Sequence, residues 1–294
     1  MNVSPRTPPA YKTYFVDLPL SRLHVLETGE GAPLIMVPAT ISEWKDWLTL
    51  AQFMAQWFTV YFFELPGHGQ SAPFSMRFSS LQVAELVEQL ADQLGFERFN
   101  LMGFSFGGIL AMRAFQRLSH RIDRLVLIAP CLGKSALPYS QKRLRILHRI
   151  TRQFERPRLQ SRFVKFVHNP RTVSLAVSVL QKAGRLEDTI PLKSKLLNIT
   201  VGTISVLAAQ IDEILTTEFA AKSAKYETPC YFAMSIYDPL LRFDVTLGIA
   251  ENHFGNLNTV RLTFPFHQPP RPFTFEELND GFYKTVDSFM RVNA

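Results

Sequence analysis

Apolar runs of strand length alternate with amphipathic stretches of helical spacing through the first 130 residues or so of the chain. The apolar runs are Tyr14 to Leu18, Leu23 to Leu26, Leu34 to Pro38, Phe58 to Leu65, Phe99 to Phe104 and Leu125 to Pro130. Helical spacing occurs near residues 42–57, 79–94 and 105–120. Such alternation is typical of βαβ units. The sequence therefore predicts an α/β fold with a mainly parallel central sheet flanked by helices.

The alternation stops after Cys131, and residues 134–225 have helical spacing broken by prolines and a glycine. Strand-like runs return at Cys230 to Met234 and Thr259 to Phe264, followed by a final amphipathic helix over Phe275 to Met290. This order predicts an α/β core over residues 1–133 and 226–294, with an inserted helical cap over residues 134–225.

The cap segment also carries the positive charge of the chain, whose formal net charge is +7. Residues 134–225 contain 17 Lys and Arg against 6 Asp and Glu, which leaves 15 against 19 elsewhere. A solvated helix face is the favoured interpretation. An anionic substrate and association with acidic membrane lipids are the alternatives. Nucleic acid is not expected as a partner, because the basic residues alternate with apolar ones and no binding motif accompanies them.

Bulk features exclude several other classes of protein. No apolar stretch approaches membrane-spanning length, and the start of the chain, residues 1–10, is polar and rich in proline, so we expect a cytoplasmic protein. Cys131 and Cys230 lie in or beside apolar runs and are expected to be buried free thiols. No metal or other cofactor is expected, because neither ligand-spaced clusters nor a Gly-x-Gly-x-x-Gly motif occurs. The sequence does not indicate an oligomeric state.

One short motif points to chemistry. Ser105 lies between Gly103 and Gly107, with a second glycine at Gly108, after a predicted strand and before a predicted helix. A serine held in a left-handed turn there needs glycine two residues to each side, because a Cβ would collide with the opposing backbone. The following helix N-terminus favours the negative charge that develops in acyl transfer. Ser105 is therefore the predicted nucleophile.

With a second signature, Leu65 to Ser71 (LPGHGQS), this motif resembles the α/β-hydrolase fold family, in the cap-bearing group related to esterases, lactonases and carbon–carbon bond hydrolases. The resemblance covers nearly the whole chain. Within it, His68 corresponds to a histidine that orders a loop, so we interpret His68 as structural.

The resemblance implies an acid and a base in the chain order Ser, acid, His. Asp238 follows the strand at Cys230 to Met234 and is the predicted acid, with Asp244 as its alternative. His267 follows the last predicted strand and is the predicted base. A Ser105, Asp238 and His267 triad is thus expected.

The loop opposite the nucleophile departs from the family. An oxyanion hole needs the N–H of the residue after the serine, here Phe106, and a second N–H from the loop after the early strand. Relatives carry His-Gly there, whereas this chain has Pro38 and Ala39, and proline has no N–H. Thr40 is the best candidate for the second donor, and Ala39 the next.

These features favour a serine hydrolase of small or medium carboxylic esters, thioesters or lactones, acting on an anionic or apolar small molecule. An apolar pocket is expected from Phe104, Phe106, Phe266 and Trp44. One alternative is a carbon–carbon bond hydrolase or lyase that uses the same triad on a carboxylated substrate. Another is a catalytically idle binding protein on this fold.

Overall fold

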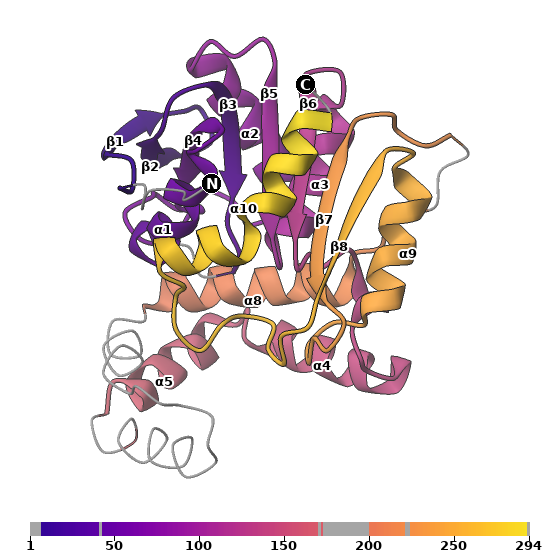
Figure 1. Ribbon diagram of the computed structural model, residues 1–294. Helices are drawn as coiled ribbons and strands as arrows, with labels where there is room; N and C mark the ends of the chain where they lie inside the picture. Colours follow the sequence, from indigo (N-terminus) through magenta and orange to yellow (C-terminus); the bar gives the residue numbers. More distant parts are fainter. Residues whose placement is uncertain (1–6, 41–42, 170–171, 173–199, 221–223, 293–294) are drawn as a thin grey trace. The chain divides into compact units, whose positions relative to one another are not determined.

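The computed structural model describes residues 7–40, 43–169, 172, 200–220 and 224–292 (Figure 1). An eight-stranded sheet runs in the order β1-β2-β4-β3-β5-β6-β7-β8. The strands are β1 (Tyr11–Asp17), β2 (Arg22–Thr28), β3 (Ala32–Val37), β4 (Phe58–Phe63), β5 (Phe99–Phe104), β6 (Ile122–Ile128), β7 (Cys230–Ser235) and β8 (Leu257–Leu262).

From β4 to β8 every neighbouring pair of strands is parallel, whereas β2 pairs antiparallel with both β1 and β4. The predicted α/β class with a mainly parallel sheet is therefore confirmed. Because parallel strands end at the same edge, the loops after β3, β5, β7 and β8 emerge on one side of the sheet. All the predicted site residues belong to these four loops, to the strand ends beside them or to the start of the helix that follows β5.

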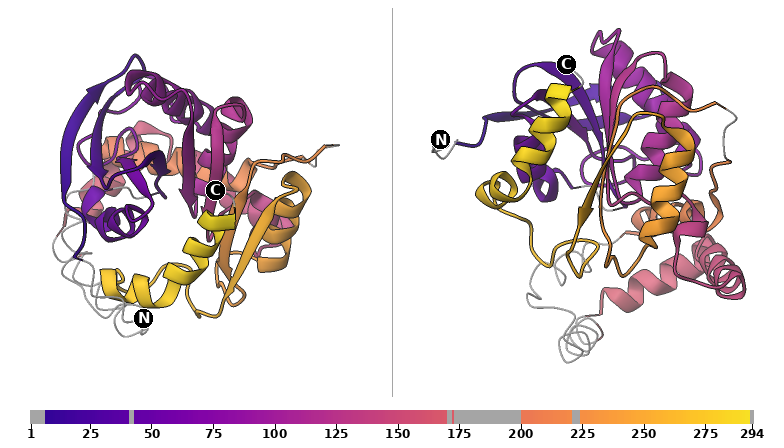
Figure 2. Two further views of the ribbon diagram at one scale, coloured as in Figure 1. Left: turned by 45° about the horizontal axis from the view of Figure 1, so that its top comes forward. Right: turned by 45° about the vertical axis from the view of Figure 1, so that its right-hand side comes forward.

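Helices cover both faces of the sheet (Figure 2). They are α1 (Trp44–Met54), α2 (Ser80–Gln93), α3 (Gly107–Leu118), α9 (Phe243–His253) and α10 (Phe275–Val292). On one face, α1 and α10 pack against a buried cluster that includes Met36, Phe62, Met102 and Tyr231. On the other face, α2 packs against α3, whose apolar residues are fully buried. Because helices cover both faces, successive residues of the central strands are buried. These strands therefore appear as continuous apolar runs in the sequence.

Several elements differ from the sequence prediction at their ends. The first strand begins at Tyr11 instead of Tyr14 and pairs along its whole length with β2. The strand expected over Phe58 to Leu65 ends at Phe63, because Glu64 turns into a loop held by its own carboxylate. His253 is the last residue of α9 and is fully buried.

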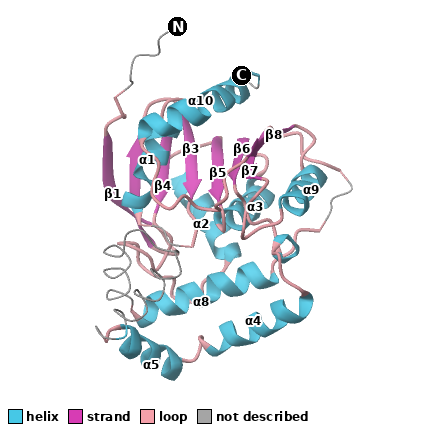
Figure 3. Ribbon diagram, turned by 60° about the horizontal axis from the view of Figure 1, so that its bottom comes forward, coloured by secondary structure: helices cyan, strands magenta, loops and turns pink. Residues whose placement is uncertain are grey.

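The chain divides into two compact units, one formed by Met1–Pro138 with Thr216–Ala294 and the other by Tyr139–Leu215. In the second unit the described helices are α4 (Gln141–Gln153), α5 (Pro157–Val167) and most of α8 (Val201–Thr216), seen from a different side in Figure 3. The expected insertion is thus helical where it is described, and its role as a cap stays a prediction. No helix of the described residues is both long and apolar enough to span a bilayer.

Candidate active site

Ser105 occupies the sharp turn between β5 and α3 and has a positive φ of 53°. Three backbone hydrogen bonds hold it there. Its N–H donates to the Ile128 carbonyl at 3.1 Å, and its own carbonyl accepts from the Gly108 and Cys131 N–H groups, each at 2.8 Å. A non-glycine residue in this region is strained and persists only where its surroundings fix it. Hydrogen bonds to β6 and the loop after it supply that constraint.

The glycines around Ser105 permit close backbone contacts. A Cβ at Gly103 would lie 2.3 Å from the Gly107 carbonyl oxygen, and a Cβ at Gly107 would lie 2.6 Å from the carbonyl oxygen of Val37. A Cβ at Gly108 would meet Pro130 at 2.6 Å. Each distance is too short for any larger residue, so the steric reason given for Gly103 and Gly107 holds, and Pro130 restricts Gly108 as well.

The three predicted triad side chains converge, although they come from three different loops. His267 Nε2 lies 2.7 Å from Ser105 Oγ, and His267 Nδ1 lies 2.6 Å from Asp238 Oδ2. The side chains of Asp238 and His267 are only 1% and 9% exposed. With the proton on Nδ1, Nε2 is free to accept the serine proton. The arrangement has the distances expected of an activated nucleophile.

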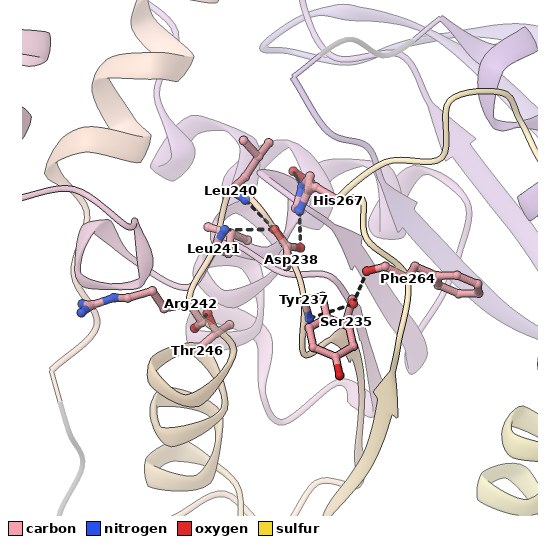
Figure 4. Close-up of polar contacts among 10 residues, drawn as sticks. Ser235, Tyr237, Asp238, Leu240, Leu241, Arg242, Thr246, Phe264 and His267 are labelled. Carbon is pink, nitrogen blue, oxygen red and sulfur yellow. Dashed lines mark hydrogen bonds and ion pairs between the residues drawn. The ribbon is translucent and has the colours of Figure 1, made fainter. Parts of the chain in front are cut away.

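Asp238 is fixed by its own backbone surroundings (Figure 4). While Oδ2 faces His267, Oδ1 accepts the N–H groups of Leu240 and Leu241 at 2.8 and 3.0 Å. These bonds stabilise the charged carboxylate and leave one oxygen for the imidazole. Asp244, the alternative acid, lies exposed in the first turn of α9.

Ser235 connects the loop of the acid to the loop of the base. Its hydroxyl donates to the Phe264 carbonyl at 2.5 Å and accepts the Tyr237 N–H at 3.1 Å (Figure 4). Beyond Phe264, the base loop is held by ring contacts, with Phe264 stacked on Phe266 at 5.1 Å and Phe273 packed beside both.

The predicted oxyanion donors come from two segments of the chain, the turn after Ser105 and the loop after β3. Phe106 caps the N-terminus of α3 without a side-chain hydrogen bond, and its amide has no partner among the described residues. Ala39 and Thr40 follow the end of β3, where Val37 pairs with Gly103. The Pro38 carbonyl oxygen would also lie 2.7 Å from a Cβ at Gly107. The loop after β3 therefore lies directly against the nucleophile turn.

A buried carboxylate that the sequence analysis did not single out binds the start of α1. Glu64 Oε1 accepts the N–H of Trp44, the first residue of α1, at 2.9 Å. Its Oε2 accepts the Gln70 N–H at 2.7 Å and lies 3.0 Å from His24 Nδ1. Both Glu64 and His24 are buried. An acidic residue ending an apolar strand was the available signal, since a buried carboxylate must be paired.

The four aromatic residues expected to form a pocket contact different parts of the protein. Phe104 lies 6.1 Å from the His267 ring, whereas Phe106 is buried and packs near Phe78. Trp44 contacts Tyr11. Of the four residues proposed, Phe104 is the one with a ring contact to the triad, and a pocket lined by all four stays a prediction.

Other predictions concern residues away from the triad. Cys131 and Cys230 are buried free thiols, as expected. His68 is buried in the loop after β4, where its N–H donates to the Leu65 carbonyl at 2.9 Å. Within the described ranges, no group of three or more His, Cys, Asp or Glu side chains could hold a metal ion.

Comparison with known proteins agrees with this fold. Residues 32–175 match the family model described as alpha/beta hydrolase fold. A pimeloyl-[acyl-carrier protein] methyl ester esterase of Nitrosomonas europaea is 30% identical over 119 residues, which cover 40% of this chain and 45% of the relative. A bacterial membrane phospholipase A has a similar structure, with a TM-score of 0.68 and 19% identity over 96% of this chain and 86% of that one. The N-formylmaleamic acid deformylase of Pseudomonas putida S16 gives a TM-score of 0.65 and 18% identity, covering 94% and 100%.

The chain therefore fits the α/β-hydrolase fold family. It matches less than half the length of the curated esterase, and the solved structures are too distant in sequence to show more than the fold.

Proposed function

We propose that this protein is a serine hydrolase that cleaves a carboxylic ester, thioester or lactone through an acyl-enzyme on Ser105. The observation that carries the proposal is the unbroken hydrogen-bond chain from Ser105 through His267 to Asp238. Named relatives that are esterases and deformylases support hydrolytic chemistry. A small-molecule substrate and a cytoplasmic location, expected from the sequence, belong to the same proposal.

In this mechanism, neutral His267 accepts the Ser105 proton on Nε2 as the serine oxygen attacks the substrate carbonyl. Asp238 keeps the Nδ1 proton in place and stabilises the imidazolium that follows. His267 then returns the proton to the leaving group. Water, activated by the same nitrogen, attacks the acyl-enzyme, and the acid product leaves with Ser105 restored.

The tetrahedral intermediate carries an oxyanion that needs two aimed N–H donors. Phe106 N–H supplies one from the α3 N-terminus, where the helix dipole adds favourable potential. Thr40 N–H supplies the second, with Ala39 as its alternative, because Pro38 has none. Glu64 positions this side of the site by fixing the start of α1, into which the loop runs.

Labelling with a fluorophosphonate probe, followed by mass spectrometry of the labelled peptide, tests the proposal. We expect modification at Ser105, and its loss in Ser105→Ala and His267→Ala. A panel of ester, thioester and lactone substrates should then show turnover that falls by a factor on the order of 10⁶ in Ser105→Ala.

Other outcomes separate the alternatives. Labelling without turnover of any ester, thioester or lactone would favour a carbon–carbon bond hydrolase or lyase on the same triad. If the folded protein did not react with the probe at all, the catalytically idle binding protein would replace the present proposal.

A further inference from the structure

The helices α4 and α5 carry many cationic side chains that have no part in the proposed mechanism. From residue 142 to residue 165 there are nine Lys and Arg but only one acidic residue, Glu155. In the same stretch, large apolar side chains remain exposed. Ile146 is 47% exposed and Ile150 is 51% exposed. A solvated basic helix face, the interpretation favoured by the sequence, gives no reason for these isoleucines.

The side of α4 away from the two isoleucines packs inside its own unit and so fixes the orientation of the helix there. Leu144 is buried, as is Thr151. His148 Nδ1 lies 2.8 Å from Asp212 Oδ1 on α8, so this side of α4 faces α8. Ile146 projects about 160° around the helix from His148. The exposed isoleucines therefore point away from the interior of this unit.

Cations surround the two isoleucines. Lys142 and Ile150 each lie four residues from Ile146, and Arg149 lies three residues from it. Arg145 is also exposed, at the flank of this surface about 100° around the helix from Ile146. None of these three cations forms an ion pair with an acidic residue in the described part of the chain. Their long apolar stems can lie along the isoleucines while the charges stay in water.

The next helix continues the pattern. Phe166 of α5 is 62% exposed, and Arg162 lies four residues before it. The turn between the helices is ordered, since Phe154 packs edge-on against Phe163 at 5.4 Å and its carbonyl accepts the Gln160 side-chain amide at 2.7 Å. Two successive helices thus present exposed apolar side chains beside several cations for which the described part of the chain offers no ion pair.

We propose that this α4–α5 face, defined by Lys142, Arg145, Ile146, Arg149, Ile150, Arg162 and Phe166, binds the surface of an anionic lipid bilayer. An interfacial helix combines these two features, because its apolar side chains enter the acyl boundary and its cations meet lipid phosphates. Association with a second copy through the same face would bring like charges together. Nucleic acid would use the cations but leave the isoleucines without a role. The proposal does not depend on the triad.

Co-sedimentation of the full chain with vesicles tests it. The protein should bind vesicles of phosphatidylglycerol mixed with phosphatidylcholine, bind pure phosphatidylcholine weakly, and lose affinity as salt is added. Arg145→Gln/Arg149→Gln should weaken binding by roughly 20 to 30 fold, or about fivefold for each cation. Lys225→Gln/Lys284→Gln, which removes two exposed cations from the other unit, is the matched control and should leave binding unchanged.

Ile146→Ser/Ile150→Ser separates a bilayer from other polyanions. This variant should lose at least about tenfold in vesicle affinity while keeping its charge. Both pairs of substitutions are at exposed positions, and circular dichroism should show the fold retained. Absence of binding to anionic vesicles would overturn the proposal. So would vesicle binding that the isoleucine variant retains in full, or duplex DNA binding that depends on the arginines and exceeds vesicle binding.

Discussion

Glu64 Oε1 accepts the Trp44 N–H at 2.9 Å, and this single bond joins the end of β4 to the start of α1. Glu43, which precedes the helix, makes no side-chain capping bond of its own. The capping function has passed to a carboxylate 20 residues further along the chain. Since the chain leads from Ala39 and Thr40 to this helix, we expect Glu64 to be a positioning residue for the proposed oxyanion hole.

Glu64→Gln should lower kcat by roughly 10 to 100 fold with little change in KM. A misplaced oxyanion-hole N–H weakens stabilisation of the transition state more than binding of the substrate. The amide keeps the size of the side chain but offers only one acceptor oxygen to the N–H groups of Trp44 and Gln70. Steady-state kinetics on a reactive ester measures the two constants.

A control variant separates positioning from stability. Thr246→Val removes a buried hydrogen bond from Thr246 Oγ1 to the Arg242 carbonyl at 2.9 Å, which contributes about 1 kcal/mol. It should lower the unfolding temperature without altering kcat. If Glu64→Gln likewise lowered the unfolding temperature and left kcat unchanged, Glu64 would have only a structural role.

Asp238→Asn should reduce turnover by about 10⁴ fold, because an amide on the Nδ1 side favours the wrong tautomer of His267. Asp244→Asn should stay close to the unmodified protein, since Asp244 is exposed on α9. Comparison of kcat/KM for the two variants on one substrate checks the assignment, and the reverse order of effects would transfer the role of acid to Asp244.

Gly107→Ala should destabilise the fold by about 1–3 kcal/mol, because its Cβ would meet the carbonyl oxygens of Val37 and Pro38 at 2.6 and 2.7 Å. Probe labelling of Ser105 should slow with it. Gly248→Ala in α9 is the matched substitution, as no atom of the described chain beyond its neighbours and its own helix backbone lies within 4 Å of the added Cβ. It should be neutral or stabilising by up to about 1 kcal/mol. Urea unfolding of both variants gives the comparison.

Burial raises the pKa of the Cys131 thiol to about 11. The folded protein therefore keeps this thiol protonated where the unfolded chain ionises it, and stability falls as the pH rises from about 9 towards about 11. Urea unfolding at pH values of about 8 and about 10 should show this loss, and Cys131→Ala should show less of it. In the native state, iodoacetamide should leave Cys131 unmodified at the lower pH. Rapid alkylation there would contradict the burial of the thiol.

Much of the fold followed from local sequence, and the reason lies in the parallel sheet. Phe99 to Phe104 is buried on both faces, so its apolar run matched the observed strand at both ends. The start of β1 was missed because its first residues, Tyr11 to Thr13, are exposed and carry no such pattern.

Prediction of the site depended on the order of elements. Ser105, Asp238 and His267 could be selected because each follows a strand that is recognisable in the sequence, and in the structure they lie within hydrogen-bond distance. The pair of His24 and Glu64 could not be found in this way, since the contact joins residues 40 positions apart that belong to no common motif. The exposure of Ile146 and Ile150 was equally hidden, as helical spacing alone does not say which side of a helix is covered.

Ser105 is not the only non-glycine residue with a left-handed backbone at the edge where the parallel strands end. Ala129, which follows β6, has a φ of 42°, and its N–H donates to the Ala233 carbonyl at 2.7 Å. Two adjacent strand ends thus hold conformations that an alanine or serine would avoid in a free peptide. These strained conformations lower the free energy of unfolding beside the proposed nucleophile. Ala129→Gly should therefore raise the stability of the protein without changing Ser105.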